Sequence, residues 1–486
     1  MEARLKVNNS IRRIRNVING ISCDGSSQDI IEVINPANNQ ILGSFSSSSE
    51  VDVAQAVEAA WATFGSWSTQ TPGARADVLR HLGNLIEENI EEFVALEVAD
   101  AGKPWSASRN GELPGIIDSF RLFANSARIM SGQSASDFAE GHTGYVRREP
   151  MGVVAGITPW NFPLWQAIWK IAPALATGNT MVIKPSELTP LSTMRFVEMA
   201  QTVLPPGVLN LVNGLGPTTG AALVSDPRVS LVSFTGSVVA GQSIASQAGK
   251  APKRVVMELG GNSPVVIFND ADLEQAVENL TGSYLYNAGQ ECMAATRWIL
   301  HKDIAKDFVD AMVESTRSKV IIGDPTNPET TLGPMISEKQ ISRVEKFIAE
   351  LPSKAEIVIG GKRAAGSGFF LEPTIIRGVD QGDDIVQEEM FAPIATVQTF
   401  STEGEALDLA NGVRHGLAGS IWTRDIGRAI RMANKYEFGT AWINTHLVVG
   451  PDMPIGGFRE SGFGKEGGAL GVEEYTRVKQ VIMSYK

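Results

Sequence analysis

Short apolar runs alternate with amphipathic stretches along the chain from residue 151 onward. Residues 152–157 form a near-continuous apolar run, which is typical of a strand buried on both faces. Residues 163–176 have helical spacing, and Gly178 follows as a stop signal. Further strand and helix signals occur at 180–184, 190–203, 208–212, 231–234 and 254–257, and a second series runs from 264 past 440. This βα series predicts an α/β fold built on doubly wound, mostly parallel sheets.

The first 150 residues and the C-terminus follow other patterns. Residues 1–50 contain short apolar runs between turn signals, which predict short strands. Apolar residues at helical spacing then predict helices at about 50–64, 75–101 and 113–129. Residues 130–148 lose that period and predict a hairpin or extended arm, and residues 475–485 alternate as an edge strand does.

Composition and charge exclude several classes of protein. The chain has 486 residues and a formal net charge of −12, which argues against nucleic acid or anionic membrane as the main partner. No run of about 18 apolar residues occurs, so no membrane span is expected. Two cysteines and five scattered histidines support neither a disulfide framework nor a metal site. We therefore expect a soluble, cytoplasmic protein that binds no metal.

Two residues have the chemistry and the setting of catalytic groups. Cys292 follows a glycine turn at the end of a predicted helix, where a thiolate could be presented to a cleft as a nucleophile. Glu258 ends an apolar strand and precedes two glycines, so burial would raise its pKa and suit it to work as a general base. The alternatives are a small buried thiol and a structural carboxylate. Cys23 lacks a comparable setting, and we expect it to be inert.

Other polar groups follow the ends of predicted strands, where open α/β sheets bind ligands. Asn161 lies on a turn bounded by prolines and offers an amide donor for an oxyanion. Ser237 can cap a helix or bond a phosphate oxygen. Lys184 and Glu187 could hold the hydroxyls of a ribose, and the carboxylate would repel a 2′-phosphate, which favours NAD over NADP. The stretch 214–220 is only a weak match to a dinucleotide-binding glycine loop.

Taken together, these stretches resemble the NAD(P)-dependent aldehyde dehydrogenase superfamily. The motifs that carry the resemblance occur in order over nearly the whole chain: Pro159-Trp160-Asn161-Phe162-Pro163, Lys184-Pro185-Ser186-Glu187, Phe234-Thr235-Gly236-Ser237, Glu258-Leu259-Gly260-Gly261, Gly289-Gln290-Glu291-Cys292 and Glu388-Glu389-Met390-Phe391-Ala392-Pro393. The chain departs from the family pattern at Ala392, where a glycine is usual, and at Glu291, which is an unusual residue before the nucleophile.

The resemblance implies three structural units and a homo-oligomer, either a dimer or a tetramer. Residues 1–128 and 149–257 would form a Rossmann-like NAD-binding domain. Residues 258–465 would form an α/β catalytic domain, and residues 129–148 with 466–486 a small β oligomerisation arm.

The resemblance also implies a mechanism. Cys292 would attack the aldehyde to form a thiohemiacetal, while the Asn161 side chain and the Cys292 N–H stabilise the oxyanion. Hydride transfer would leave a thioester, and Glu258 would activate the water that hydrolyses it. Lys184 completes the predicted catalytic set. The predicted NAD contacts are Thr158, Trp160, Lys184, Ser186, Glu187, Gly216, Gly220, Thr235, Gly236, Ser237, Leu259, Glu389 and Phe391.

Several stretches are similar to those of bacterial γ-aminobutyraldehyde dehydrogenases, among them residues 284–290, 140–143 and 444–446. Such substrates carry an ammonium group, which carboxylates and aromatic faces bind. The predicted substrate contacts are Phe162, Trp165, Trp169, Glu291, Glu112 and Asp452. We therefore predict oxidation of an ω-aminoaldehyde such as 4-aminobutanal.

Other functions stay open at this point. Ile455 stands where many aminoaldehyde enzymes have an aromatic residue, which argues against quaternary ammonium aldehydes. Betaine aldehyde or a general aliphatic aldehyde remains an alternative substrate. A non-redox thiol hydrolase or acyltransferase would use Cys292 without a cofactor, and a non-catalytic protein is disfavoured because both Cys292 and Glu258 are present.

Overall fold

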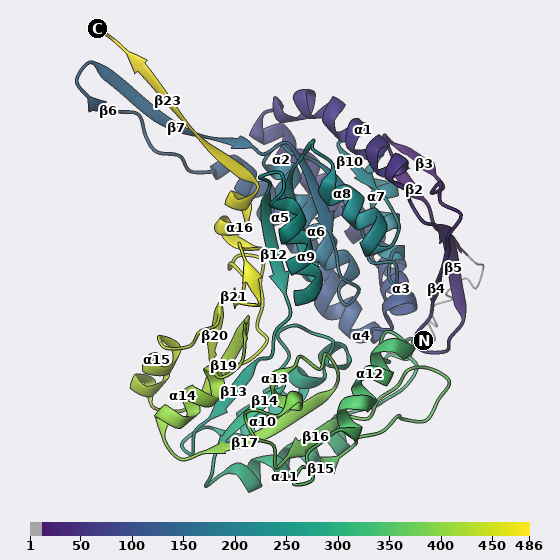
Figure 1. Cartoon of the computed structure of the whole chain (residues 1–486), viewed down its shortest axis with the longest axis vertical. Helices are drawn as coiled ribbons and strands as arrows, with labels where there is room; N and C mark the ends of the chain where they lie inside the picture. The colour runs from purple at the N-terminus through teal and green to yellow at the C-terminus, as the bar shows by residue number, and fades with distance from the viewer. Residues whose placement is uncertain (1–11) are drawn as a thin grey trace.

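Two large β-sheets with covering helices make up the body of the molecule in the computed structural model, which describes residues 12–486 (Figure 1). The first sheet has eight strands in the order β22-β12-β11-β8-β9-β10-β2-β3. Its parallel centre consists of β8 (Val153–Ile157), β9 (Thr180–Lys184), β10 (Leu209–Leu211), β11 (Val229–Gly236) and β12 (Arg254–Leu259). The antiparallel edges are β2 (Asn16–Ile18), β3 (Ile21–Cys23) and β22 (Gly462–Phe463).

The order of the parallel strands positions the site. From β8 the chain adds β9 and β10 on one side and then returns to add β11 and β12 on the other. The direction of winding therefore reverses between β8 and β11. In doubly wound sheets, the crevice beyond the carboxyl ends of the strands at such a point binds ligands.

The second sheet has seven strands in the order β15-β16-β17-β14-β13-β19-β20. They are β13 (Pro264–Ile267), β14 (Arg297–His301), β15 (Glu356–Ile359), β16 (Thr374–Arg377), β17 (Ile394–Phe400), β19 (Ala418–Trp422) and β20 (Thr440–Ile443). All neighbours are parallel except β15 and β16. Two parallel-centred sheets confirm the predicted α/β fold.

Helices cover both sheets, and small strands complete the fold. The helices are α1 (Glu50–Ser68), α2 (Pro72–Glu88), α3 (Ile90–Ala101), α4 (Trp105–Ala107), α5 (Leu113–Ile129), α6 (Pro163–Ala176), α7 (Leu191–Ala200), α8 (Ala221–Ser225), α9 (Val238–Ala248), α10 (Leu273–Leu285), α11 (Ala305–Lys319), α12 (Glu338–Ala349), α13 (Asp384–Gln387), α14 (Glu403–Asn411), α15 (Ile426–Ala433) and α16 (Gly468–Glu474). The remaining strands of the body are β1 (Arg12–Arg13), β4 (Ile30–Ile34), β5 (Ile41–Ser46), β18 (His415–Gly416) and β21 (Phe458–Arg459).

The predicted helix at 75–101 is wrong in one respect, because the structure divides it into α2 and α3. Asn89, at the junction, has φ −119° and ψ 26°, outside the helical region, and its side chain donates to the Leu85 carbonyl (2.9 Å). An asparagine that bonds its local backbone competes with the helix in this way. The predictions at 113–129 and 163–176 coincide with α5 and α6.

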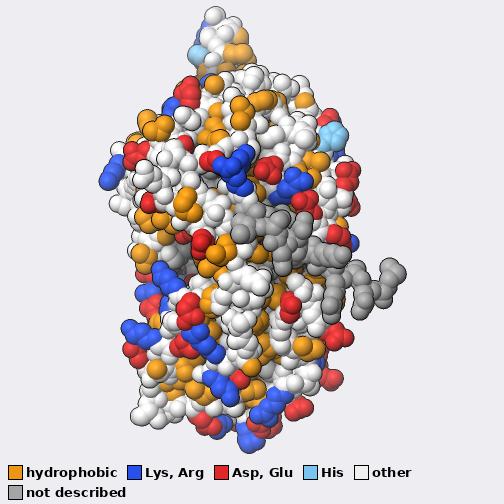
Figure 2. Space-filling model, turned by 90° about the vertical axis from the view of Figure 1, so that its right-hand side faces the viewer, with side chains coloured by type: hydrophobic (Ala, Val, Ile, Leu, Met, Phe, Trp, Pro, Cys, Tyr) orange, Lys and Arg blue, Asp and Glu red, His pale blue; other side chains and the backbone are white. Residues whose placement is uncertain are grey.

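A three-stranded arm extends from the body. Strands β6 (Ser136–Ala139) and β7 (His142–Pro150) form a hairpin, and β23 (Thr476–Ser484) pairs with β7 over its whole length. This confirms the predicted hairpin and edge strand. The arm carries the C-terminus away from the sheets (Figure 1) and stands clear of the body with apolar side chains on its surface (Figure 2). Among these, Phe138, Val478 and Ile482 are at least half exposed.

The predicted domain boundaries stay a prediction. One observation bears on them: β22 belongs by sequence to the range 258–465, but it pairs with β12 of the first sheet. Within residues 12–486, no helix combines the length and the apolar character needed to span a bilayer.

Candidate active site

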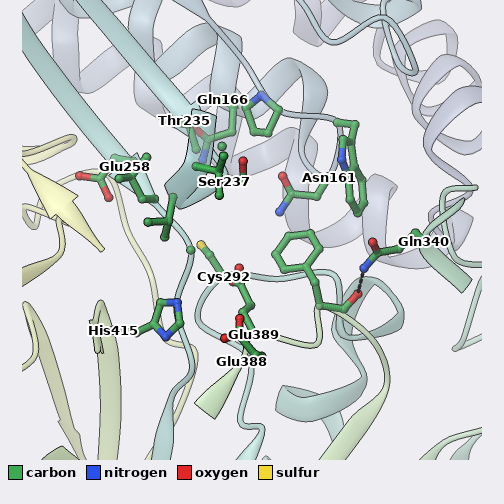
Figure 3. A pocket seen from close by; sticks show the side chains of 18 of the residues that line it. Asn161, Gln166, Thr235, Ser237, Glu258, Cys292, Gln340, Glu388, Glu389 and His415 are labelled. Atoms are coloured by element: carbon green, nitrogen blue, oxygen red, sulfur yellow. Dashed lines mark hydrogen bonds between the residues drawn. The ribbon is translucent and has the colours of Figure 1, made fainter. Parts of the chain in front are cut away.

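Two adjoining cavities of about 400 and 450 Å³ meet at Cys292. The residues that line both cavities are Gln166, Thr235, Glu258, Leu259 and Cys292. The first cavity lies at the carboxyl ends of β8 and β11, at the reversal of winding (Figure 3). The second is lined by aromatic and aliphatic side chains. We call them the cofactor cavity and the substrate cavity.

Cys292 stands on a loop whose backbone is unusually constrained. Asn287, Ala288 and Gly289 all have positive φ, at 50°, 55° and 68°. A Cβ at Gly289 would lie 2.1 Å from the Ala392 carbonyl oxygen, so only glycine fits there. The loop thus turns sharply after α10 and places the thiol at the junction of the two cavities. Burial, with nearby carboxylates led by Glu291, raises the pKa of the Cys292 thiol well above its usual range.

Asn161 lies across the cofactor cavity from this loop and is tied to it. Its Nδ2 donates to the Gln290 carbonyl (3.0 Å), and its own carbonyl accepts from the Asn287 side chain (2.8 Å). Asn161 and Cys292 side chains extend toward the same space in Figure 3. The amide is therefore held in a rigid frame beside the nucleophile, as an oxyanion donor requires.

Glu258 is the penultimate residue of β12 and is 6% exposed. Burial first, and then the nearby Glu466 carboxylate, raise its pKa well above the ordinary carboxyl range. Its Oε1 has no hydrogen-bond partner among the described residues. Behind it, the Lys170 ammonium contacts Glu466 (2.6 Å) and the Thr235 hydroxyl (2.7 Å). A carboxyl group whose pKa is raised by burial is suited to the work of a general base.

The cofactor cavity offers the groups that a nicotinamide dinucleotide needs. Trp160 and Phe391 stand edge to face with centroids 5.2 Å apart, and Ser237 caps α9, whose N-terminus attracts anions. The Glu389 carboxylate accepts from the Gly261 N–H (2.8 Å), and its pKa rises to about 7, mainly through burial. Above β8, the buried Thr158 hydroxyl has no partner among the described residues, which leaves a polar atom for a ligand.

Lys184 and Glu187 lie further along the same crevice. The Lys184 ammonium donates to the Pro185 carbonyl (2.8 Å) and stands 3.5 Å from the Glu187 carboxylate. A Cβ on Gly220 would come within 3.7 Å of the Lys184 side chain, so the 214–220 turn is its neighbour, while Gly216 is exposed. Lys184 lines neither cavity at Cys292. Its place in the catalytic set therefore stays a prediction, as does the ribose contact that it would make together with Ser186.

The substrate cavity has aromatic walls. Trp165 and Trp169 stand edge to face at 6.0 Å, and Phe162 stacks on Tyr286 at 6.1 Å. Tyr286 was missed as a site residue, although it belongs to the 284–290 stretch that resembles γ-aminobutyraldehyde dehydrogenases. Glu291 is buried and lines the same cavity.

Two predicted substrate contacts lie elsewhere. Glu112 is buried behind Tyr286, where it pairs with Lys103 and accepts from the Tyr286 hydroxyl (3.3 Å). Asp452 is exposed on a surface turn. Neither is among the residues that line the substrate cavity, and direct contact of either side chain with the substrate stays a prediction. Proximity in sequence to the cavity did not reveal which way these side chains point.

His446, in the 444–446 stretch, supports the nucleophile loop from the other side. Burial lowers its pKa to about 4, so the ring is neutral near pH 7. Its Nε2 donates to the Met293 carbonyl (2.8 Å), and its Nδ1 accepts from the Ser420 hydroxyl (2.8 Å). These two hydrogen bonds hold the carbonyl group of Met293, the residue after Cys292. Sequence reasoning gave His446 no role because both partners come from distant segments.

A thiol beside a buried carboxylate and an amide donor, at the ligand crevice of a doubly wound sheet, defines a cysteine-dependent enzyme with a dinucleotide-type cleft. Sequence comparison agrees: the profile of the Aldehyde dehydrogenase family matches residues 23–481, and the chain belongs to that family.

Individual relatives are similar over almost the whole chain. A betaine aldehyde dehydrogenase of Bacillus subtilis is 38% identical over 477 residues, covering 96% of this chain and 97% of that protein. A phenylacetaldehyde dehydrogenase of Pseudomonas fluorescens is 38% identical over 481 residues, covering 96% and 95%. A solved betaine aldehyde dehydrogenase of Staphylococcus aureus in complex with NAD⁺ has a TM-score of 0.94 at 37% identity, covering 97% and 94%. The narrower resemblance to γ-aminobutyraldehyde dehydrogenases stays a prediction.

Proposed function

We propose that this protein is an NAD-dependent aldehyde dehydrogenase that prefers aldehydes with an ammonium group at the far end, such as 4-aminobutanal. One observation carries the preference. Four aromatic rings line the substrate cavity: Phe162, Trp165, Trp169 and Tyr286. Its described lining contains no lysine or arginine.

The chain's own residues divide the chemistry between them. Cys292 forms a bond to the aldehyde carbon, and the carbonyl oxygen takes up negative charge. Asn161 has two amide N–H bonds, and because only one donates to Gln290, the other is left for this oxygen. Once the hydride has left the thiohemiacetal, the thioester is hydrolysed by water, and Glu258 takes the proton of that water.

When bound, NAD supplies the acceptor for the hydride that converts the thiohemiacetal into the thioester. The chain's part is to hold it. Trp160, Ser237 and Phe391 would contact its nicotinamide and pyrophosphate side. Lys184 and Glu187 would hold the adenosine ribose, and the Glu187 carboxylate would repel the 2′-phosphate of NADP.

The preference for a cation follows from the aromatic faces. A cation over an exposed aromatic face gains about 0.5–1 kcal/mol, and about 2 when water is excluded. The Tyr286 hydroxyl donates a hydrogen bond to the buried Glu112 carboxylate, which increases the electron density of the ring. Glu112 thus acts through Tyr286 rather than by direct contact.

Betaine aldehyde is the second candidate substrate, because relatives at 38–39% identity carry that name. It has a permanent positive charge and would use the same aromatic walls. The aliphatic Ile455 in the cavity wall limits the aromatic surface for a trimethylammonium group, which favours the smaller primary amine.

A panel of aldehydes with NAD tests the proposal. We expect kcat/KM for 4-aminobutanal to exceed that for uncharged butanal by about tenfold or more, as 1.4 kcal/mol predicts. Betaine aldehyde should fall between them. Equal kcat/KM for 4-aminobutanal and butanal would refute the cation preference while leaving the reaction class intact.

Two further points complete the proposal. A non-redox thiol hydrolase would need no cofactor, so the absence of thermal stabilisation at saturating NAD would favour that alternative. The exposed apolar residues of the arm support a homo-oligomer in which the arm of one copy packs on another.

A further inference from the structure

The carboxylate of Glu291 is in direct contact with the nucleophile. The Cys292 Sγ donates to Glu291 Oε1 at 3.4 Å, and the same oxygen accepts from the Met293 N–H at 3.3 Å. Glu291 is 8% exposed and lines the substrate cavity with Cys292. The hydrogen bond from the Met293 N–H holds Glu291 Oε1 in place, and this is the oxygen that contacts the Cys292 sulfur.

Cys292 has to lose its proton before it can attack an aldehyde, since the thiolate is the nucleophile. Glu258 is placed poorly for this task. Its carboxylate points away from the Cys292 sulfur in Figure 3, and no hydrogen bond joins the two groups among those of the described residues. We propose that Glu291 is the base that accepts the Cys292 proton, which leaves Glu258 to act on the hydrolytic water.

The step balances without an added reagent. The S–H bond breaks as the O–H bond to Glu291 Oε1 forms, and the sulfur electron pair forms the bond to the aldehyde carbon. The charge moves from carboxylate to thiolate and then to the substrate oxygen beside Asn161. This inference rests on the proposed role of Cys292 as the nucleophile, but not on the identity of the aldehyde.

Substrate geometry argues against Glu291 as the partner of the far ammonium group. In 4-aminobutanal, four bonds of about 1.5 Å each separate the aldehyde carbon from the nitrogen. When that carbon is bonded to Sγ, an extended chain places the ammonium well beyond a carboxylate that touches Sγ. The cation would then meet the aromatic walls, and Glu291 would stay with the reacting end.

The surroundings of Glu291 suit a base that works near neutral pH. Burial raises its pKa to about 7, against the opposing effect of its bonds to Met293 and Cys292. The charged and titratable groups nearby are Glu112, Lys103, Tyr286, Glu389 and Cys292 itself. Lys103 forms ion pairs with Glu97 and Glu112, and its ammonium opposes the rise in the pKa of Glu291.

Alkylation of Cys292 in the absence of substrate tests the assignment. The chain has only two cysteines, so Cys23→Ser leaves a single thiol to react with iodoacetamide. We measure the alkylation rate from pH 5.5 to 10 in the Cys23→Ser protein, alone and combined with Glu291→Gln. The amide keeps an acceptor for the Met293 N–H, which preserves the loop.

The two roles of Glu291 predict effects of opposite sign. If it is the base, Glu291→Gln slows alkylation at pH 7.5 by tenfold or more, and the parent rate rises with a midpoint near pH 7. If it is only a negative neighbour, its removal lowers the thiol pKa and speeds alkylation, which overturns the proposal. Slower alkylation in Glu258→Gln with no effect of Glu291→Gln would also overturn it.

A second variant and a second readout guard against a folding defect. Glu291→Asp keeps a carboxylate, and we expect it to retain the pH-dependent rise at a reduced rate. In turnover, Glu291→Gln should lower kcat/KM by the same factor for 4-aminobutanal and butanal. A loss confined to 4-aminobutanal would instead assign Glu291 to binding of the ammonium group and refute its role as the base.

Discussion

Replacement of Glu291 by glutamine should change how the stability of the protein depends on pH. The side chain is buried, and its pKa in the folded protein is about 7, against an ordinary value of 4.5. Between these two values the folded protein holds a proton that the unfolded chain has released. The free energy of unfolding of the wild-type protein therefore falls as pH rises from about 4.5 to 7. Glu291→Gln lacks this pH-dependent loss, because its side chain does not ionise.

The size of the effect follows from the pKa difference. A difference of about 2.5 units corresponds to roughly 3 kcal/mol at full ionisation, of which about 2–3 kcal/mol develops between pH 5 and 8.5. Below the unfolded value the contribution vanishes. Any difference in packing between the amide and the protonated acid is the same at every pH, so it does not affect this comparison.

Thermal unfolding of both proteins at pH 5 and pH 8.5, at equal ionic strength and scan rate, measures the effect. The Tm of Glu291→Gln relative to wild type should rise by several degrees between the two pH values, at roughly 2–4 °C per kcal/mol for a domain of about 200 residues. A Tm difference that is the same at both pH values would refute the reasoning, because Glu291 would then titrate alike in the folded and unfolded chains.

Three further predictions concern catalysis, cofactor and assembly. Glu258→Gln should keep a burst of NADH equal in amount to the active sites, while its steady-state kcat falls about 10²–10⁴-fold. Cys292→Ala should abolish both the burst and the turnover. A Glu258→Gln enzyme with normal kcat would contradict the assignment of Glu258 as the base. Glu187→Gln should raise kcat/KM with NADP relative to NAD by about fivefold, as loss of roughly 1 kcal/mol of repulsion predicts, and an unchanged ratio argues against the ribose contact. Removal of residues 476–486 should yield a smaller species in light scattering, whereas an unchanged mass would show that β23 does not hold the subunits together.

Local sequence was enough to predict the elements where one strong signal marks each end. Helix α6 begins with Pro163 at its first turn and is followed by Gly178 with φ 89°, so both limits follow from residue chemistry. The division at Asn89 was not predicted, because the apolar period continues across it. The break depends on a side chain that bonds the backbone, which periodicity does not record.

In the candidate site too, some residues could be found from the sequence and others only from the structure. Cys292 and Glu258 were found from sequence because few residue types serve as nucleophile or base, and each follows or precedes glycine at the end of an element. The ion pair of Glu112 with Lys103 could not be predicted, because it depends on how two segments pack together. His446 acts through Met293 and Ser420, which lie far from it in the chain.

The sequence by itself therefore determined the α/β class, the boundaries of a few elements such as α5 and α6, the candidate nucleophile and the family resemblance, since these depend on residue type and short-range spacing. Only the tertiary structure decided which carboxylates reach the cavities and which are already paired. Pairing and burial set the pKa of a carboxyl group, and both arise when distant segments pack together. For that reason Glu291, which any reading of the sequence places beside Cys292, could be assigned to its thiol only after the loop geometry was known.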